Sequence, residues 1–219
     1  MTGSSRIPSN VDARSAALLE RAYSLKGARD THDLYRDWAE TYDKTMLDGL
    51  GYVSPRLVTS LLAQHVSERD QPVLDVGCGT GLAGHELSAL KFSTIDALDY
   101  SADMLAQAGK RGIYRNLIET DLTSPLDLAS ETYGAAVCSG TFTHGHVGPS
   151  CLVELFRVLK PGALFAFSVN AGVWTGMGFD EELARLEKNG TAHLLHRQAG
   201  VNYKTSTQPD SWLNLYERK

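Results

Sequence analysis

The pattern of hydrophobic and polar positions divides the chain near Pro72. Before this residue, apolar side chains recur every three or four positions in three stretches, which is typical of amphipathic helices. The first stretch begins at Asp12, and the second begins at Thr31, a helix-capping residue type. The third begins at Ser54, where a capping serine is followed by Pro55. The chain before Pro72 is therefore predicted to contain helices and no strand.

After Pro72, short apolar runs alternate with helical stretches. Strands are predicted over residues 73–76, 93–98, 114–120, 134–139 and 163–169, and helices over about 80–90, 101–110 and 149–159. Ser101 is the predicted cap of the 101–110 helix, and Lys160-Pro161-Gly162 is predicted to end the 149–159 helix. This alternation indicates β-α-β units and a parallel sheet.

The C-terminal part of the chain has a different pattern. A helix is predicted over residues 179–188, followed by strands at 192–198 and 211–217. The connection between these strands contains Gly200 and Pro209 and is long for a hairpin, so we expect a functional or mobile loop. The predicted fold class is α/β: a Rossmann-like, mostly parallel sheet of seven strands with helices on both faces and an N-terminal helical cap. The expected organisation is an N-terminal arm and helix over 1–30, a helical lid over 31–70 and the Rossmann-like core over 71–219.

Composition narrows the choice of partners. A chain of 219 residues can bury about 70% of the surface that it exposes when unfolded. The 21 Lys and Arg residues and 26 Asp and Glu residues form no block of like charge, so nucleic acid and anionic membranes are disfavoured as main partners. The three cysteines (Cys78, Cys138 and Cys151) form no disulfide pattern, and the N-terminus lacks the apolar run of a signal peptide. We expect a cytoplasmic protein with no membrane partner; its oligomeric state is not predicted.

The strongest local motif is VLDVGCGTGLAG at residues 73–84, where a strand runs into four glycines. Residues 79–84 form a G-x-G-x-x-G string, which is typical of dinucleotide-binding loops. Asp75 lies in the strand before the glycines, however, and a carboxylate there would repel a pyrophosphate. It suits a ligand that carries positive charge, and S-adenosylmethionine has an ammonium, a sulfonium and no phosphate.

These residues resemble the class I S-adenosylmethionine-dependent methyltransferases, whose acidic-x-G-x-G-x-G motif is matched by residues 75–81. DALDYSADML at 96–105, ETDL at 119–122 and LFRVLKPGALFAFS at 155–168 are similar to later motifs of that family. Within it, YRDWAETYD at 35–43 and FDEELARLEKNG at 179–190 are most similar to the Williams–Beuren syndrome region methyltransferase-like proteins. The resemblance implies S-adenosyl-L-methionine as cofactor and methyl transfer as activity.

The resemblance also implies which residues would hold the cofactor. Asp75 would orient the glycine loop and the methionine ammonium, and Asp99 would accept hydrogen bonds from both ribose hydroxyls. Asp121 would accept from the adenine amine. The further contacts that the resemblance implies are the loop glycines Gly77, Gly79 and Gly81 and the adenine neighbours Tyr100, Met104 and Leu122. The helix at 35–43 is expected to fold over the cofactor as a lid, with the hydroxyls of Tyr35 and Tyr42 reaching its polar groups. As alternatives, Asp99 and Asp121 are helix caps, and Tyr100, Met104 and the lid residue Trp38 belong to the core.

The methyl-acceptor end is expected to lie at CSGTFTHGHVGPS, residues 138–150. This stretch lacks the Asn/Asp-Pro-Pro-Tyr motif of nucleobase and glutamine methyltransferases and the metal-binding acids of catechol-type enzymes. His144 and His146 are candidate general bases, because the pKa of histidine lies near working pH; alternatively, they hold the loop by bonding to backbone. With Cys151 they would be too few zinc ligands, so no metal is expected. The apolar residues Trp174, Met177 and Phe179 are candidates for an acceptor pocket.

The sequence therefore predicts a methyltransferase that moves a methyl group from S-adenosylmethionine to a hydroxyl, amine or thiol of a small molecule. One alternative is a non-catalytic protein that binds S-adenosylmethionine or S-adenosylhomocysteine. A weaker alternative is an NAD-dependent oxidoreductase that uses the G-x-G-x-x-G string.

Overall fold

The computed structural model describes residue 17 and residues 42–219. Residue 17 is helical. The remaining predictions for residues 1–41 lie outside the described residues: the helix from Asp12, the Thr31 cap, and the placement of Tyr35 and Trp38. The 1–30 arm and the first part of the 31–70 lid remain predictions for the same reason.

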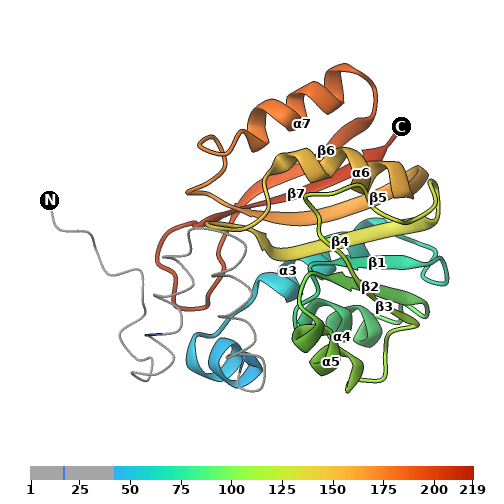
Figure 1. The fold of residues 1–219 in the computed structure, drawn as a ribbon. Helices are drawn as coiled ribbons and strands as arrows, with labels where there is room; N and C mark the ends of the chain where they lie inside the picture. The colour runs from blue at the N-terminus through green and yellow to red at the C-terminus, as the bar shows by residue number, and fades with distance from the viewer. Residues whose placement is uncertain (1–16, 18–41) are drawn as a thin grey trace, which may run out of the picture.

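The described residues form a seven-stranded sheet that carries helices on both faces (Figure 1). The strands are β1 (Val73–Val76), β2 (Ile95–Asp99), β3 (Asn116–Glu119), β4 (Tyr133–Phe142), β5 (Leu159–Asn170), β6 (Ala192–Gly200) and β7 (Ser211–Arg218). The α-helices are α3 (Ser54–His65), α4 (Leu82–Ala89), α5 (Ala102–Gly109), α6 (Leu152–Val158) and α7 (Phe179–Lys188). A π-helix, η1 (Lys44–Gly49), precedes α3, and a 3-10 helix, η2 (Pro149–Cys151), precedes α6.

The strand order is β3-β2-β1-β4-β5-β7-β6, and only the pairs that involve β7 are antiparallel. The predicted α/β, Rossmann-like, mostly parallel sheet is thereby confirmed. The order reverses between β1 and β4, and a sheet of this kind leaves a crevice outside the carboxyl ends of its strands at such a point. The topology therefore indicates where a ligand would bind.

Two apolar layers cover the sheet. On one face, α3 and α4 contribute Val58, Leu62 and Leu87 to a buried cluster. On the other face, α6 and α7 pack Phe156 and Leu183 against the aromatic side chains of β5 (Figure 1). The four residues of β1 are all buried because this strand is central and covered on both sides. Among the described residues, no helix has the length and apolar character needed to cross a bilayer.

Several predicted boundaries differ from the structure. The predicted 149–159 helix begins with the 3-10 turn η2 and ends at Val158, and Leu159 already belongs to β5, where it pairs with Tyr133 of β4. The prediction that residues 160–162 separate helix from strand was therefore wrong. Gly162 has a φ of +80°, and the β4–β5 register shifts beside it, so the strand passes through a distortion that sequence periodicity does not show.

The two predicted serine caps had different outcomes. Ser101 is confirmed as the N-cap of α5, since its hydroxyl accepts a hydrogen bond from the Met104 N–H at 3.3 Å. Ser54 was predicted wrongly, because the N-cap of α3 is Val53. The Ser54 hydroxyl instead donates to the Ser168 hydroxyl of β5 at 3.1 Å. A tertiary partner thus replaces the local one.

The long connection between β6 and β7 packs against the segment that precedes α3. The Val53 N–H donates to the Asn202 carbonyl at 2.8 Å, and the Lys204 N–H donates to the Gly51 carbonyl at 2.8 Å. Between these bonds, Tyr52 and Tyr203 form an isolated β-bridge, and their ring centroids lie 5.6 Å apart. The connection therefore holds residues 51–53 in place.

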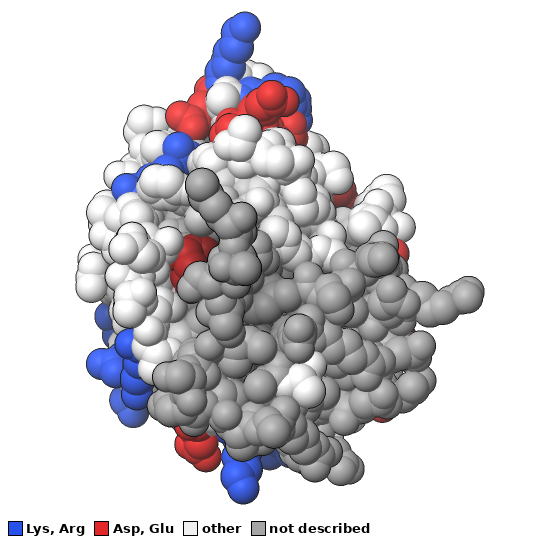
Figure 2. All heavy atoms as spheres, turned by 90° about the vertical axis from the view of Figure 1, so that its left-hand side faces the viewer, with Lys and Arg blue, Asp and Glu red and all other residues white. Residues whose placement is uncertain are grey.

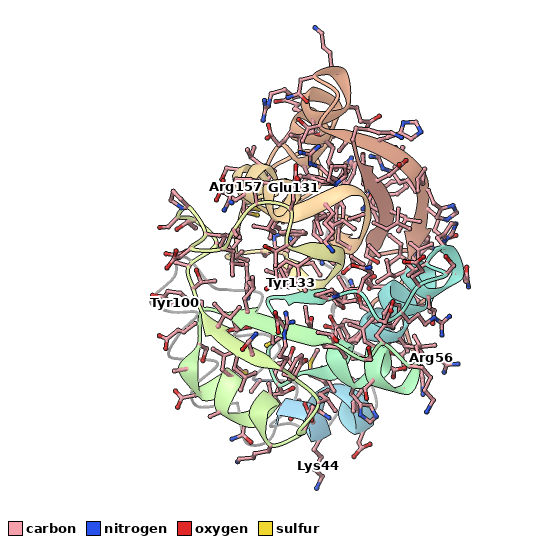
Figure 3. All side chains as sticks on the ribbon, turned by 90° about the vertical axis from the view of Figure 1, so that its right-hand side faces the viewer. Lys44, Arg56, Tyr100, Glu131, Tyr133 and Arg157 are labelled. Atoms are coloured by element: carbon pink, nitrogen blue, oxygen red, sulfur yellow. The ribbon has the colours of Figure 1, made fainter. Side chains whose placement is uncertain are left out.

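A buried carboxylate joins three strands at the amino ends of the sheet. Asp96 of β2 accepts two hydrogen bonds from Arg115, at 2.9 and 2.6 Å, one from Asn116 at 3.0 Å and one from the Tyr133 hydroxyl at 3.0 Å. Figure 3 views the molecule from this side, with Tyr133 labelled near its centre. Burial alone would raise the pKa of Asp96, but these donors outweigh it and the pKa is lowered.

Asp96→Asn is expected to lower the free energy of unfolding by about 1–3 kcal/mol at neutral pH, because it removes the charge that satisfies these donors. A carboxyl with a lowered folded-state pKa contributes stability above its unfolded pKa and loses it as the pH falls through the folded pKa. The difference from wild type should therefore shrink on acidification in urea denaturation series. The exposed Asp127→Asn is the control, and an equal loss there would contradict this role for Asp96.

Candidate functional site

A cavity of about 460 Å³ lies at the carboxyl ends of β1, β2, β3 and β4. We call it the strand-end cavity. Most of the predicted site residues line it: Tyr42, Asp75, Gly77, Gly79, Asp99, Tyr100, Met104, Asp121, Leu122 and His146. Two of the predicted site residues that the structure describes, Gly81 and His144, do not line the cavity. The fold thus brings together predicted site residues that lie up to 104 positions apart in the sequence, from Tyr42 to His146.

Asp75 lies in the central strand and is only 1% exposed. Its Oδ2 accepts a hydrogen bond from the Tyr114 hydroxyl at 2.7 Å, and the Gly84 N–H is a second donor. Burial raises the pKa of Asp75 to about 6, since the effects of these donors and of the Arg111 cation are smaller than that of desolvation. The carboxylate is therefore mostly charged at neutral pH. Its burial disfavours this charge, and a cationic ligand would reduce that free-energy penalty.

The four glycines of the loop have three different kinds of surroundings. At Gly79, with a φ of +55°, a Cβ would meet nothing within 4 Å, so this position leaves open space beside the cavity. At Gly77, a Cβ would lie 2.1 Å from the Thr141 hydroxyl of β4. At Gly81 and Gly84, the nearest atom is the Tyr114 hydroxyl, at 2.9 and 2.1 Å. The last two glycines therefore make room for the Tyr114 side chain that bonds to Asp75.

Asp99 ends β2 and ties the glycine loop to the start of α5. Its Oδ2 accepts from the Gly79 N–H at 2.8 Å, and its Oδ1 accepts from the Ser101 N–H at 2.9 Å. Burial raises the pKa of Asp99, although its backbone donors act in the opposite direction. Each oxygen keeps acceptor capacity for a second hydrogen bond, which is what two vicinal hydroxyls of a ligand require.

The expected adenine neighbours follow Asp99 and β3. Tyr100 is 47% exposed and projects at the edge of the molecule (Figure 3), whereas Met104 is buried beneath the cavity. The Asp121 Oδ1 accepts from both the N–H and the hydroxyl of Thr123, at 2.8 and 2.7 Å, which fixes the orientation of the carboxylate. Leu122 is buried and also lines the cavity. A flat ring would have an exposed aromatic side chain on one side and buried apolar groups on the other.

The two histidines lie in different places. His146 lines the cavity, and burial lowers its pKa, so the ring is neutral at pH 7. Its Nδ1 lies 2.8 Å from the His144 carbonyl oxygen, which assigns the proton to Nδ1 and a lone pair to Nε2. His144 instead lies beside Gly172, where a Cβ would come within 2.7 Å of its Nε2. The structure therefore brings only His146 into the cavity wall.

The three apolar residues expected at an acceptor pocket do not line the cavity. Phe179 is fully buried and packs on Phe142 with ring centroids 5.2 Å apart, so its prediction as a pocket residue was wrong. Trp174 packs against Trp212 and lies under the Arg197 guanidinium. Met177 packs against the same core as Phe179. The apolar residues between β5 and the start of α7 therefore pack against the core.

Sequence reasoning missed several residues around the cavity. Tyr52 and Ser139 line it, and their hydroxyl oxygens lie 3.4 Å apart. Tyr114 and Arg111 support the glycine loop from outside it. The sequence feature that could have identified Tyr52 is its position as a polar aromatic residue just before the Ser54-Pro55 helix start. No local sequence pattern links Tyr52 to Ser139. Among the described residues, no three His, Cys, Asp or Glu side chains gather as a metal site.

Comparison with known proteins agrees with this geometry. A family described as a methyltransferase domain matches residues 74–167. Methyltransferase-like protein 27 of Homo sapiens is 31% identical over 180 residues, which are 80% of this chain and 73% of that protein. The ubiquinone biosynthesis O-methyltransferase of Xanthomonas oryzae pv. oryzae is 30% identical over 129 residues, 55% of this chain and 54% of that protein. A TehB-like SAM-dependent methyltransferase structure from Corynebacterium glutamicum has the same fold, with a TM-score of 0.63 at 18% identity over 84% of this chain and 98% of that one.

Gly84→Ala tests the support of Asp75 by Tyr114. Alanine usually stabilises a helix relative to glycine, but here its Cβ would lie 2.4 Å from the Tyr114 Cζ and displace the ring. We expect a loss of about 1–3 kcal/mol in the free energy of unfolding, measured by urea denaturation. Gly176→Ala is the control, because a Cβ there meets nothing within 4 Å. A Gly84→Ala protein as stable as wild type would contradict the packing argument.

Proposed function

The chain belongs to the class I S-adenosylmethionine-dependent methyltransferases, and from this we propose that it methylates a hydroxyl, amine or thiol of a small molecule. S-adenosyl-L-methionine is the methyl donor of the family. Oxygen acceptors are the first class to test, because one relative is named as an O-methyltransferase. The single observation that supports the proposal most is the convergence of Asp75, Asp99 and Asp121 on one cavity.

The cavity residues fit the donor chemically. We propose that Asp75 attracts the ammonium of the methionine end, Asp99 accepts from the ribose hydroxyls and Asp121 accepts from the adenine amine. Gly79 leaves space for close approach of the ligand to the backbone. When bound, S-adenosylmethionine supplies an electrophilic methyl carbon; the protein has to align an acceptor with it and exclude water.

We propose His146 as the residue that takes a proton from the acceptor. A histidine that acts as a general base must be unprotonated and within reach of the acceptor atom. The lowered pKa of His146 keeps its ring neutral at pH 7, and the assigned tautomer places the lone pair on Nε2. Because His144 holds that tautomer through its backbone carbonyl, the pair acts as one unit in which only His146 touches the acceptor.

Charge on the described surface supports an acceptor without a large phosphate backbone. Figure 2 shows Lys and Arg side chains at the margins of the face it presents, with acidic side chains among them at the top. The formal net charge of the chain is −5. We therefore propose a small neutral or weakly charged acceptor in preference to nucleic acid.

Two finer assignments remain part of the proposal. We place the chain with the Williams–Beuren syndrome region methyltransferase-like proteins, because of YRDWAETYD at 35–43 and the 179–190 segment. We also propose a cytoplasmic location, for which the three buried thiols of Cys78, Cys138 and Cys151, none of them in a disulfide, give support.

The NAD alternative is disfavoured because Gly84, the last glycine of the G-x-G-x-x-G string, faces the Tyr114 ring.

Donor binding is tested by titration calorimetry with S-adenosylmethionine, S-adenosylhomocysteine and NAD. We expect binding of the first two and none of NAD. Since a ligand ammonium favours the charged form of Asp75, S-adenosylhomocysteine should bind about tenfold more tightly at about pH 7.5 than at about pH 5. Below a pKa of about 6 the carboxyl becomes neutral and this attraction is lost.

Asp75→Asn separates this effect from the titration of other groups that face the cavity. The variant should bind more weakly than wild type at about pH 7.5, with an affinity that stays level across the range. Asp99 also has a raised pKa and lies near Asp75. A wild-type pH slope in Asp75→Asn would therefore assign the titration to Asp99 and contradict the ammonium contact.

The base is tested with methyl-labelled S-adenosylmethionine and a panel of small phenols, alcohols, amines and thiols. With the best acceptor, His146→Gln should lower kcat by about 10²–10⁴-fold and leave S-adenosylhomocysteine affinity nearly unchanged. His144→Gln is the matched variant and should have a smaller effect. Wild-type turnover in His146→Gln would remove the base assignment. Donor binding without turnover of any acceptor would favour the non-catalytic alternative.

A further inference from the structure

The segment Tyr42–Val53, which we call the 42–53 segment, forms one wall of the strand-end cavity. Tyr42 and Tyr52 line the cavity from this segment, and η1 lies between them. The C-terminal end of the segment is held by the β6–β7 connection through the bonds at Gly51 and Val53. π-helical turns often occur at functional sites. The N-terminal end of the segment, beside Tyr42, is held by a different set of contacts.

The N-terminal end of the 42–53 segment is attached to the glycine loop through the side chains of Asp43, Thr80 and Arg111. The Asp43 Oδ1 accepts a hydrogen bond from the Thr80 hydroxyl at 2.5 Å, and Asp43 also forms an ion pair with Arg111. The Arg111 Nε in turn donates to the Thr80 carbonyl at 2.6 Å. Thr80 is buried, lies between Gly79 and Gly81, and lines the cavity. These bonds form a closed ring between the segment, the glycine loop and the turn after α5.

Glycine at position 81 makes this ring sterically possible. With a φ of +85°, a Cβ at Gly81 would lie 3.1 Å from the Arg111 Cδ and 2.9 Å from the Tyr114 hydroxyl. The outer side of the loop is therefore occupied by Arg111 and Tyr114, while its inner side faces the cavity. Any ligand held by the inner side is coupled through Thr80 to Asp43, the residue next to Tyr42.

We propose that Asp43 and Arg111 are positioning residues that hold Tyr42 and Thr80 against the bound cofactor and so slow its release. This proposal rests on the proposed donor binding at the same cavity. Neither Asp43 nor Arg111 is among the described residues that line the cavity, so they act through their neighbours. Their side chains are 42% and 21% exposed, so the ion pair can open to solvent without unfolding the core, and salt should weaken it.

The test measures how fast labelled S-adenosylhomocysteine leaves the full chain when excess unlabelled ligand is added. Asp43→Asn and Arg111→Gln should each speed release by about 5–30-fold, with little change in the association rate. The double variant should release no faster than the faster single variant, because both substitutions break one ring. Raising NaCl from about 0.1 to 1 M should speed release from wild type and have less effect on the variants.

Two controls carry the same charge changes at exposed neighbouring positions: Asp48→Asn in the same segment and Lys110→Gln beside Arg111. Both should release ligand at the wild-type rate. Arg111→Lys keeps the charge but loses the two-pronged geometry, so its rate should lie between those of wild type and Arg111→Gln; it also serves if Arg111→Gln fails to fold.

The outcomes separate this inference from the proposed function. If wild type does not bind S-adenosylhomocysteine, the proposed function fails. If wild type binds and the Asp43 and Arg111 variants release ligand at the wild-type rate, only the positioning role fails. Equal acceleration in the controls, or additive effects in the double variant, would also overturn the ring and leave donor binding intact.

Discussion

The Asp75 carboxylate lies in the central strand of the sheet, where burial penalises its charge and only groups from other parts of the chain can offset that penalty. Tyr114 and the Gly84 N–H supply hydrogen bonds, and Arg111 supplies a nearby positive charge. Tyr114 and Arg111 can take these positions because Gly81 and Gly84 lack side chains. The glycine loop is therefore shaped from both sides, by the cavity within and by Tyr114 and Arg111 outside.

The same constraint organises the other acids of the site. In a parallel sheet, the carboxyl ends of the strands lie at one edge, so acidic residues at or near the carboxyl ends of β1, β2 and β3 share a cavity although they lie far apart in sequence. Asp99 is bound to the Gly79 N–H, which makes the loop conformation depend on the second strand as well as the first. The carboxylate that we propose for recognition of the ribose hydroxyls thus also holds the glycine loop in its conformation.

Much of the fold and part of the site were predictable from the sequence because the signals are local. The alternation of apolar runs after Pro72 predicted the seven strands, and Ser101 predicted the start of α5 through a capping bond that is present. The failures are tertiary. Ser54 bonds to Ser168 across 114 positions, and Phe179 belongs to the core because β4 places Phe142 against it. Tyr114 was missed because no sequence rule links it to Asp75, 39 positions earlier.

Two buried aspartates differ in how far the fold compensates their charge. Asp96 receives four hydrogen bonds, two of them from a guanidinium, and its pKa is lowered, so its charge is fully satisfied by the fold. Asp75 is equally buried and faces a cavity, but its donors are neutral and its pKa is raised to about 6. A carboxylate that the fold leaves only partly compensated, at the point where the strand order reverses, gains stability from a cationic ligand. That difference in compensation, more than the glycine spacing, is the physical reason why we propose a ligand-binding role for Asp75 and a structural role for Asp96.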